Sequence, residues 1–248
     1  MRKTATFLAR MTSVVALAAA TAVVGVGAPI AVLAFPTPIA TVPLGLSSTF
    51  AVLTGATVGN TVTGPQTMLR GDLGAHGAIT GFSPPGAYTG TLYSGAAADP
   101  ALADLDIAYA NAKARTGGVA LPAVLAGLTV HPGVHTSSGA AGAAAAGTFT
   151  IDADGDPNAV FIFQIGAALS MGANSHVLLI GQAKASNVFW VVTGAGAVGA
   201  DSTFVGTMMA SAAIDVGANS IFNGRALAQT GAITLNSNQF YSSEPTVS

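Results

Sequence analysis

The sequence predicts a mainly β fold, built as a three-sided solenoid with one α-helix. Short apolar or alternating runs bounded by Gly, Asn, Ser and Asp fill most of the chain after residue 118, as expected for strands joined by turns. The C-terminal part also repeats itself with an offset near 18 residues. That offset suits one coil of three sides, with about six residues on each side.

The strands and the repeat can be placed along the chain. Strands are expected at 160–165, 176–180, 188–192, 204–208 and 226–228. Residues 199–206 (Gly-Ala-Asp-Ser-Thr-Phe-Val-Gly) align with residues 217–224 (Gly-Ala-Asn-Ser-Ile-Phe-Asn-Gly), and weaker copies begin at Gly172 and Leu235. A β-sandwich whose turns share a composition is the alternative. The near-identity of the turns favours a solenoid whose stacked coils share one core, with Gly and Asn at the corners.

One α-helix is expected at about residues 99–116. Asp99 is a good N-cap residue and Pro100 suits the first helical position, while Gly117 and Gly118 are typical of a helix end. Apolar residues recur at three- and four-residue steps at Leu102, Leu105, Tyr109 and Ala112. This single apolar stripe predicts that the helix packs against something flat and apolar.

The N-terminal region differs from the rest. Residues 1–34 carry basic residues followed by an apolar run, which is typical of a signal peptide, with cleavage after Ala34. A retained membrane anchor at residues 14–35 is the alternative, because a span needs about 20 residues. Pro-rich residues 35–43 are expected to form an extended linker. The solenoid domain is then expected at 44–242, followed by a tail at 243–248.

Composition limits the possible functions. Charged residues make up 7% of the chain, far below the roughly 25% of an ordinary soluble domain. Without residues 1–34, five basic residues face ten acidic ones, a net charge of −5, so there is no basic footprint for a nucleic acid. The chain has no cysteine, which rules out disulfides, thiolate metal sites and a cysteine nucleophile.

Motifs for chemistry are weak. Residues 194–199 match the dinucleotide fingerprint, but a strand-like segment follows where a helix is needed. Residues 152–156 resemble the opening of a calcium loop, yet Pro157 and Phe163 stand where an EF-hand needs Gly and Glu. A weak calcium site of another kind remains an alternative to three acids in a solvated turn. His131 and His135 flank a Pro-Gly turn and are expected on the surface.

Catalysis has little local support in the sequence. Outside residues 152–156 the acidic residues are scattered, and local context suggests no Ser/His/Asp set. A non-enzymatic protein without a cofactor or a small-molecule substrate is therefore expected. Clusters that form only in space are not visible at this level.

Several stretches resemble segments of one known protein family, both in their residues and in their order along the chain. They are residues 44–55, 71–74, 79–86, 128–134, 152–164, 187–190, 203–207 and 223–228. Together they are similar to the bacterial and fungal ice-binding proteins of the DUF3494-like type. The resemblance covers about four-fifths of the chain. It implies a right-handed, irregular, three-faced β-helix with a long α-helix alongside, secreted and monomeric, whose partner is the surface of an ice crystal.

The resemblance also implies candidate site residues. In this family one flat face contacts ice, and coils of several members carry a Thr-(Ala/Gly)-x-(Thr/Asn) pattern. Residues 54–57 match it fully, and four later coils match it partly, with Met, Val, Val and Leu in place of the first threonine. The implied ice-binding face comprises Thr54, Thr57, Met171, Asn174, Val198, Asp201, Val216, Ala218, Asn219, Leu235 and Asn238. A secreted structural or adhesive module that binds the cell envelope or a polysaccharide is the rival function.

Overall fold

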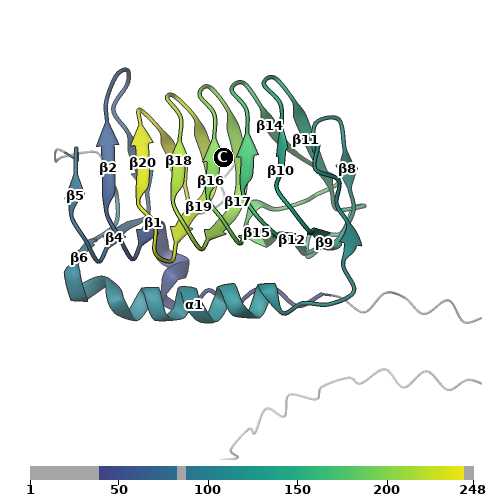
Figure 1. The fold of residues 1–248 in the computed structure, drawn as a ribbon, viewed down its shortest axis with the longest axis horizontal. Helices are drawn as coiled ribbons and strands as arrows, with labels where there is room; N and C mark the ends of the chain where they lie inside the picture. The colour runs from purple at the N-terminus through teal and green to yellow at the C-terminus, as the bar shows by residue number, and fades with distance from the viewer. Residues whose placement is uncertain (1–38, 83–87, 243–248) are drawn as a thin grey trace, which may run out of the picture. The chain divides into compact units, whose positions relative to one another are not determined.

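The computed structural model describes residues 39–82 and 88–242, and this part of the chain forms a β-solenoid with one α-helix (Figure 1). The strands of this part pair in parallel, and neighbouring coils stack side by side along the long axis. The mainly β fold class predicted from the sequence is thereby confirmed. In the described residues, no helix is long and apolar enough to cross a membrane.

Three faces surround the core. The helix face contains β6 (Leu92–Ser94), β4 (Asp72–Ala75), β1 (Phe50–Thr54), β19 (Ile221–Ala228), β17 (Thr203–Ala210), β15 (Val188–Val192), β12 (Phe161–Ile165), β9 (Gly133–Ser137) and β7 (Val119–Ala120). The seven-stranded face contains β10 (Ala141–Ala143), β13 (Leu169–Met171), β16 (Gly196–Val198), β18 (Ile214–Val216), β20 (Ile233–Asn236), β2 (Val58–Thr61) and β5 (Ile79–Thr80). The third face contains β8 (Thr129–Val130), β11 (Thr148–Asp152), β14 (His176–Ile180), the first residues of β17 and β19, β21 (Gln239–Tyr241) and β3 (Met68–Arg70).

The expected strands are found with small differences at their ends. Strands β14 and β15 match the predicted ranges, whereas β17 and β19 begin earlier because each continues around a corner from the third face to the helix face. The 18-residue offset is the coil itself, since Thr203 pairs with Ile221 and Ala210 with Ala228. The repeat therefore predicts both the strands and their register.

The coils are not stacked in sequence order. Strand β1 pairs with β19 on one side and β4 on the other, so the N-terminal coils lie beyond the C-terminal ones. Helix α1 (Asp99–Lys113) runs along the solenoid and carries the chain to the opposite end, from which the remaining coils return (Figure 1). A short 3₁₀-helix, η2 (Gly95–Ala98), leads into it, and two others are η1 (Gly45–Thr49) and η3 (Ala185–Asn187).

A file of aromatic rings fills the interior of the solenoid. Rings lie in contact from Phe149 through Phe163, Trp190, Phe204 and Phe222 to Phe240, with centroids 4.1–5.7 Å apart. All six side chains are fully buried. Trp190 Nε1 donates a hydrogen bond to the carbonyl of Val205 at 2.9 Å, so its one polar atom is paired. The coils between β9 and β21 thus contribute rings that no single coil could bury alone.

The helix covers the helix face through a second apolar cluster. Its buried residues are Ala101, Leu105, Ala108, Tyr109 and Ala112, which pack against outward residues such as Ile162, Val191, Met209 and Leu227. Leu105, Tyr109 and Ala112 of the predicted stripe are buried, and Leu102 is partly buried. The N-cap prediction is wrong. Asp99 is the first helical residue, and its carboxylate pairs with His76 Nδ1 at 2.6 Å instead of capping a backbone N–H.

The predicted domain limits can be compared only in part. Residues 1–34 and the tail 243–248 lie outside the described residues, as does the proposed anchor at 14–35. Within the predicted linker, residues 39–43 carry no helix or strand, but Val42 is 3% exposed and belongs to the cluster under the helix. This segment therefore packs on the solenoid and is not a free linker. The helix ends at Lys113, three residues before the expected end.

Candidate functional site

Six of the predicted site residues are buried. They are Thr54, Met171, Val198, Val216, Leu235 and Asn238, each no more than 2% exposed. Side chains alternate between the two sides of a strand, and in β13, β16, β18 and β20 it is the residue before these apolar positions that points outward. Asn238 is held inside by its Nδ2 donating to the carbonyl of Gly217 at 2.7 Å. These six assignments are corrected, because such side chains cannot touch a surface.

The remaining predicted residues lie on two opposite edges of the seven-stranded face. Thr57 is exposed at the edge next to the helix face, where its carbonyl accepts the N–H of Ile233. Asn174, Asp201 and Asn219 are exposed at the edge next to the third face, with Ala218 half-buried beside them. The pattern at residues 54–57 and the later partial copies therefore belong to different corners of the solenoid. They lie on opposite edges of one sheet and do not form one cluster.

The corner next to the third face is a regular backbone turn. Ala146, Asn174, Asp201, Asn219 and Ser237 stack there, all with φ between 54° and 60°. Asn and Asp tolerate this left-handed conformation better than most residues, which confirms the corner role expected for Asn. The turn positions are fixed by hydrogen bonds between coils, such as Asn174 N–H to the carbonyl of Ala200 at 2.8 Å.

Behind this corner lies a buried ladder of serine hydroxyls that the sequence reasoning missed. Ser175 N–H donates to Ser202 Oγ at 3.1 Å, and Ser202 N–H donates to Ser220 Oγ at 3.3 Å. Each hydroxyl in turn donates to a carbonyl of the adjacent turn, Ser202 Oγ to Gly172 and Ser220 Oγ to Gly199. The recurrent serine after Gly-Ala-Asn was the available signal, because a buried N–H needs an acceptor.

Between the two edges, the exterior of the seven-stranded face carries only small side chains in straight rows. The central row, in register across the strands, is Gly142, Ser170, Ala197, Asp215, Thr234, Gly59 and Thr80. The edge row, whose carbonyls accept the next strand's N–H, is Ala168, Ala195, Ala213, Ala232, Thr57 and Ala78. Parallel strands repeat at about 4.8 Å. The face thus presents methyl groups and a few hydroxyls at a regular spacing.

Asp215 is the charged member of the central row. Thr234 Oγ1 donates a hydrogen bond to its carboxylate, and the pair borders a shallow depression of about 260 Å³ that Thr61, Gly217 and Asn236 also line. At the nearby corner Asn219 Nδ2 donates to Asp201 Oδ1 at 3.3 Å. Both carboxylates are therefore tied to neighbouring coils, and the rest of the central and edge rows is neutral.

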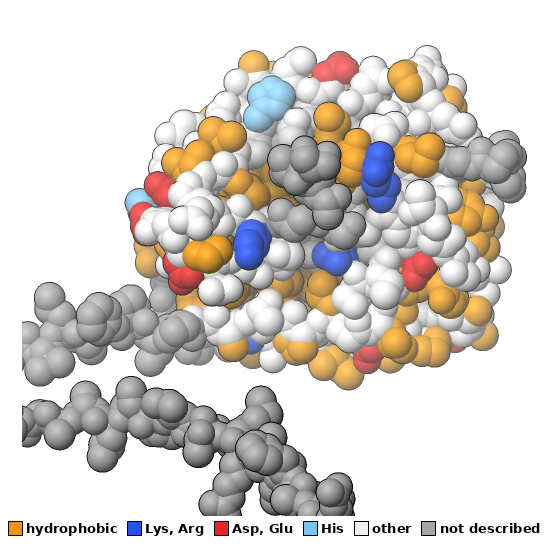
Figure 2. Space-filling model, turned by 180° about the vertical axis from the view of Figure 1, so that it is seen from behind, with side chains coloured by type: hydrophobic (Ala, Val, Ile, Leu, Met, Phe, Trp, Pro, Cys, Tyr) orange, Lys and Arg blue, Asp and Glu red, His pale blue; other side chains and the backbone are white. Residues whose placement is uncertain are grey.

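The other two faces are less uniform. Helix α1 covers the helix face, and the third face exposes bulky and ionisable side chains, among them Leu178 (48% exposed), Ile180, Ile221 and His176. Figure 2, turned by 180° from Figure 1, shows Lys, Arg, Asp and His side chains scattered among hydrophobic ones. The seven-stranded face is accordingly the uncovered face with the smallest and least charged exterior.

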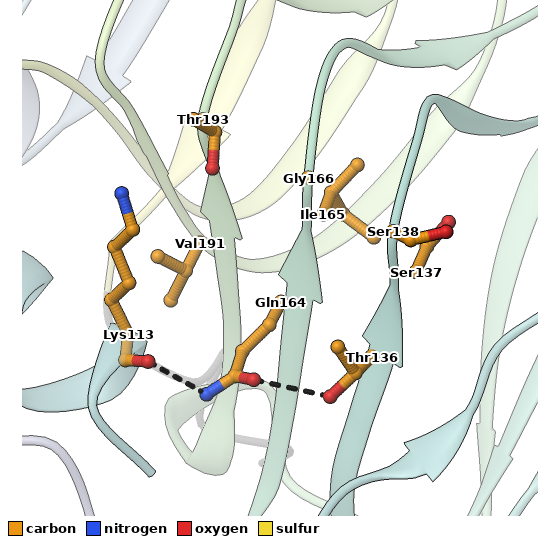
Figure 3. Close-up of a pocket in the computed structure, with 9 residues that line it drawn as sticks. All are labelled: Lys113, Thr136, Ser137, Ser138, Gln164, Ile165, Gly166, Val191 and Thr193. Carbon is orange, nitrogen blue, oxygen red and sulfur yellow. Dashed lines mark hydrogen bonds between the residues drawn. The ribbon is translucent and has the colours of Figure 1, made fainter.

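A depression of about 280 Å³ at the end of the helix has a structural explanation (Figure 3). Gln164 Nε2 donates to the carbonyls of Ala112, Lys113 and Arg115, and Gln164 Oε1 accepts from Thr136. One amide thereby satisfies carbonyls that the last helical turn leaves unpaired. The residues at this depression anchor the helix to the helix face.

Two ionisable groups whose pKa is lowered by burial are also structural, and one of them, His135, is 6% exposed although the sequence predicted it on the surface. Burial lowers the pKa of His135, whose Nε2 bonds the carbonyl of His131 at 2.8 Å. Burial likewise lowers the pKa of Arg225, which donates to the carbonyl of Ser48 at 2.8 Å. Residues 194–199 run through a turn into strand β16 rather than a helix N-terminus, so the geometry that a bound pyrophosphate requires is not formed there.

Comparisons with known proteins agree with this geometry. The family model described as "Ice-binding-like" matches residues 52–241. This chain belongs to the ice-binding-like family. A relative from Nostoc sp. (strain HG1), named an ice-binding protein, is 37% identical over 201 residues, covering 79% of this chain and 72% of the relative.

Solved structures of ice-binding-like proteins show the same fold. A crystal structure of an ice-binding protein from an Antarctic biological consortium aligns with a TM-score of 0.78 and 38% identity, over 82% of this chain and 92% of that one. The ice-binding protein of the Antarctic ascomycete Antarctomyces psychrotrophicus aligns with a TM-score of 0.76 and 33% identity, over 83% of this chain and all of that one. The family resemblance in the sequence is therefore confirmed.

Proposed function

We propose that this chain binds ice through the exterior of the seven-stranded face. The observation that carries the proposal is the pair of rows of small side chains in strand register. The edge row includes Thr57, and Asn174 and Asn219 border the opposite edge of the face. Membership of the ice-binding-like family supports it. No catalytic step is part of the proposal.

The seven-stranded face suits ice because its side chains are regularly spaced and bind individual water molecules only weakly. Rows at about 4.8 Å hold methyl groups and hydroxyls in a fixed array, to which an ordered layer of water can conform. A dense charged surface would bind water more firmly and in orientations set by each charge. The backbone ladders and the aromatic core hold this array rigid, so little conformational entropy is lost on adsorption.

We further infer that the protein acts outside the cell as a monomer, after removal of residues 1–34. The basic and apolar character of that segment supports export, and the low charge of the chain suits a protein that meets a crystal surface. Electrophoresis and N-terminal sequencing of protein from the culture medium test this, with a mature chain starting near Phe35 as the expected result. A chain that retains residues 1–34 in the membrane fraction would contradict export.

The ice-binding proposal is tested by growing a single ice crystal in a dilute solution of the protein. Faceted growth with a measurable gap between the freezing and melting temperatures is expected. A round crystal with no gap, from protein whose circular dichroism shows a folded β structure, would refute ice binding.

A second candidate function is adhesion through the third face. The exposed Leu178 and Ile180 on β14 and Ile221 on β19 lie on that face, separated by the first residues of β17, and favour association with another macromolecule. Sedimentation with purified cell-envelope material distinguishes the two functions. Cosedimentation that Leu178→Asp abolishes, in protein without effect on ice, would support adhesion instead.

A further inference from the structure

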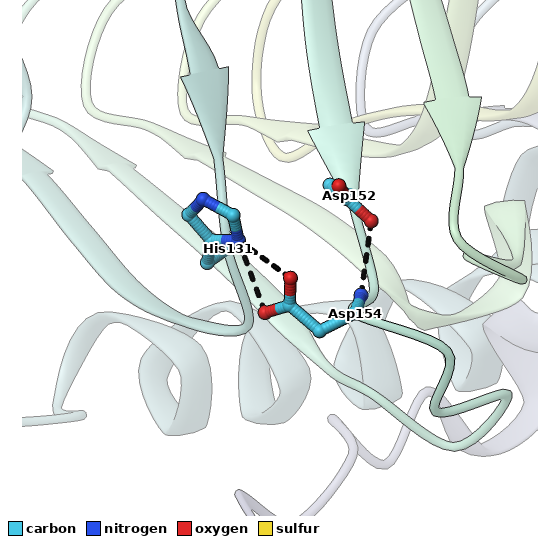
Figure 4. A group of neighbouring side chains, drawn as sticks. All are labelled: His131, Asp152 and Asp154. Carbon is cyan, nitrogen blue, oxygen red and sulfur yellow. Dashed lines mark hydrogen bonds and ion pairs between the residues drawn. The ribbon is translucent and has the colours of Figure 1, made fainter.

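A group of potential metal ligands lies at the edge of the third face. His131, Asp152 and Asp154 each offer one ligand atom, and these atoms lie within 4.8 Å of one another (Figure 4). Within the described residues, this is the one such group of three or more His, Cys, Asp or Glu side chains. It is formed by residues 23 and 21 positions apart in the chain and lies away from the seven-stranded face.

The three side chains are brought together by the pairing of two adjacent coils. His131 directly follows β8 and Asp152 ends β11, and these strands pair at Val130 and Ile151. His131 Nδ1 lies 2.9 and 3.0 Å from the two carboxylate oxygens of Asp154, which occupies a left-handed turn position with φ 53°. The group is therefore a product of coil register.

The segments that carry these ligands are held by neighbouring residues and by one hydrogen bond within the group. The buried His135 bonds the carbonyl of His131 at 2.8 Å and stacks on Phe163, with ring centroids 5.3 Å apart. Asp152 Oδ1 accepts the N–H of Asp154 at 3.0 Å. A Cβ at Gly181 would lie only 2.1 Å from Asp152 Oδ1, so glycine leaves the room that this carboxylate occupies. Ligands fixed in this way lose little freedom when an ion binds.

We propose that His131, Asp152 and Asp154 bind a divalent transition-metal ion of the Zn²⁺ class. Imidazole nitrogen and carboxylate oxygen are both ordinary zinc ligands, and the imidazole disfavours Ca²⁺ and Mg²⁺, which take oxygen ligands. Two carboxylates would supply the negative charge that offsets the ion. Coordination through Nδ1 replaces the His131–Asp154 hydrogen bond. A neutral ring then carries its one proton on Nε2, and a net proton passes to solvent only when the ring starts as the imidazolium.

This assignment differs from the calcium loop suggested by residues 152–156. The carboxylate of Asp156 accepts the N–H of Asn158 at 2.8 Å and is not one of the three grouped ligands. A histidine from the neighbouring coil takes part instead. Because the ion would join two coils, it is expected to stabilise that end of the solenoid.

The test is calorimetric titration of the tag-free chain with zinc chloride, with magnesium and calcium chloride as comparisons. Saturable binding of one zinc ion per chain, a raised midpoint of thermal unfolding and no response to magnesium or calcium are expected. His131→Asn and Asp152→Asn should each weaken zinc binding at least about tenfold, in line with the loss of a ligand. The matched control is His176→Asn, which removes another exposed histidine from the third face and should bind zinc as the unchanged chain does.

Three results would overturn the proposal: no zinc binding at millimolar concentration, equal zinc affinity in His131→Asn, or loss of binding in His176→Asn. Circular dichroism of each variant establishes that it is folded, and His131 is exposed enough for its replacement to leave the core intact. Ice-crystal shape is expected to be the same with and without zinc. The zinc site and the ice-binding proposal therefore stand or fall separately.

Discussion

Removal of a single buried hydroxyl tests how the corner beside the seven-stranded face is held. Ser202 is 2% exposed, and its Oγ accepts the N–H of the fully buried Ser175 and donates to the carbonyl of Gly172 at 3.0 Å. In Ser202→Ala the N–H of Ser175 loses this acceptor. An unsatisfied buried donor costs about 1–3 kcal/mol, so the free energy of unfolding should fall by about that amount.

Urea denaturation followed by circular dichroism measures this loss as a lower midpoint with an unchanged slope. For a domain of this size, each kcal/mol corresponds to about 2–4 °C in the thermal midpoint. The matched control is Ser170→Ala, in the neighbouring coil and on the exposed exterior, which should change stability by less than about 0.5 kcal/mol. Equal stability of the two variants would refute the reasoning that the internal hydroxyls satisfy buried backbone groups.

Three further predictions concern charge, pH and backbone conformation. Asp215→Thr removes the charge from the central row and should enlarge the gap between freezing and melting temperatures measured on a single crystal; a smaller gap would contradict it. Burial lowers the pKa of His135 below 6.5, so that as the pH falls the unfolded chain binds a proton at this residue before the folded chain does. The stability contributed by neutral His135 is therefore fully present above pH 6.5 and is lost as the pH falls through the folded-state pKa. The free energy of unfolding, measured by urea denaturation at several pH values, should therefore fall less with decreasing pH in His135→Gln than in the unchanged chain. An equal pH dependence in the two proteins would show that His135 does not cause the loss. In Gly224→Ala, a Cβ at φ 147° would lie 2.0 Å from the carbonyl oxygen of Gly206. Thermal unfolding should therefore show a loss of stability of about 1–3 kcal/mol or more. The control Gly139→Ala, which places its Cβ in open space, should be neutral or slightly stabilising.

The repeat made much of the fold predictable from local signals. The 18-residue offset implies the register of β17 and β19, and the spacing of apolar residues identifies most of the buried side of α1. The Asn residues at the corners adopt the expected positive φ. These features depend on short stretches of sequence and on the geometry of parallel stacking, both of which a single chain displays.

The arrangement of the coils was not predictable in the same way. Strand β1 pairs with β19, about 170 residues away, and nothing local marks that contact. The Asp99 prediction was wrong because η2 continues directly into the helix, and His76, from another coil, pairs with the carboxylate. Contacts between distant segments decided both outcomes.

Five of the predicted site residues lie at the borders of the seven-stranded sheet, and the other six lie on the core side. The family pattern was carried onto Met171, Val198, Val216 and Leu235, which face the core. The alternation Ile214-Asp215-Val216 and Ile233-Thr234-Leu235 already contained the correction, because an apolar residue on each side of a polar one indicates that the polar residue points outward. The alanine edge row lacks such contrast, and only the structure shows it as a row.

The most direct test of the ice-contact surface places the same bulky residue on two different faces. Ala213→Tyr adds a ring to the exposed edge row, next to Ala195 and Ala232, and Thr148→Tyr adds one to the exposed exterior of the third face. Both variants should unfold at nearly the same temperature as the unchanged chain. Single-crystal growth is expected to show that Ala213→Tyr loses faceting and the freezing–melting gap while Thr148→Tyr keeps both. The opposite pattern would place ice contact on the third face and contradict the account.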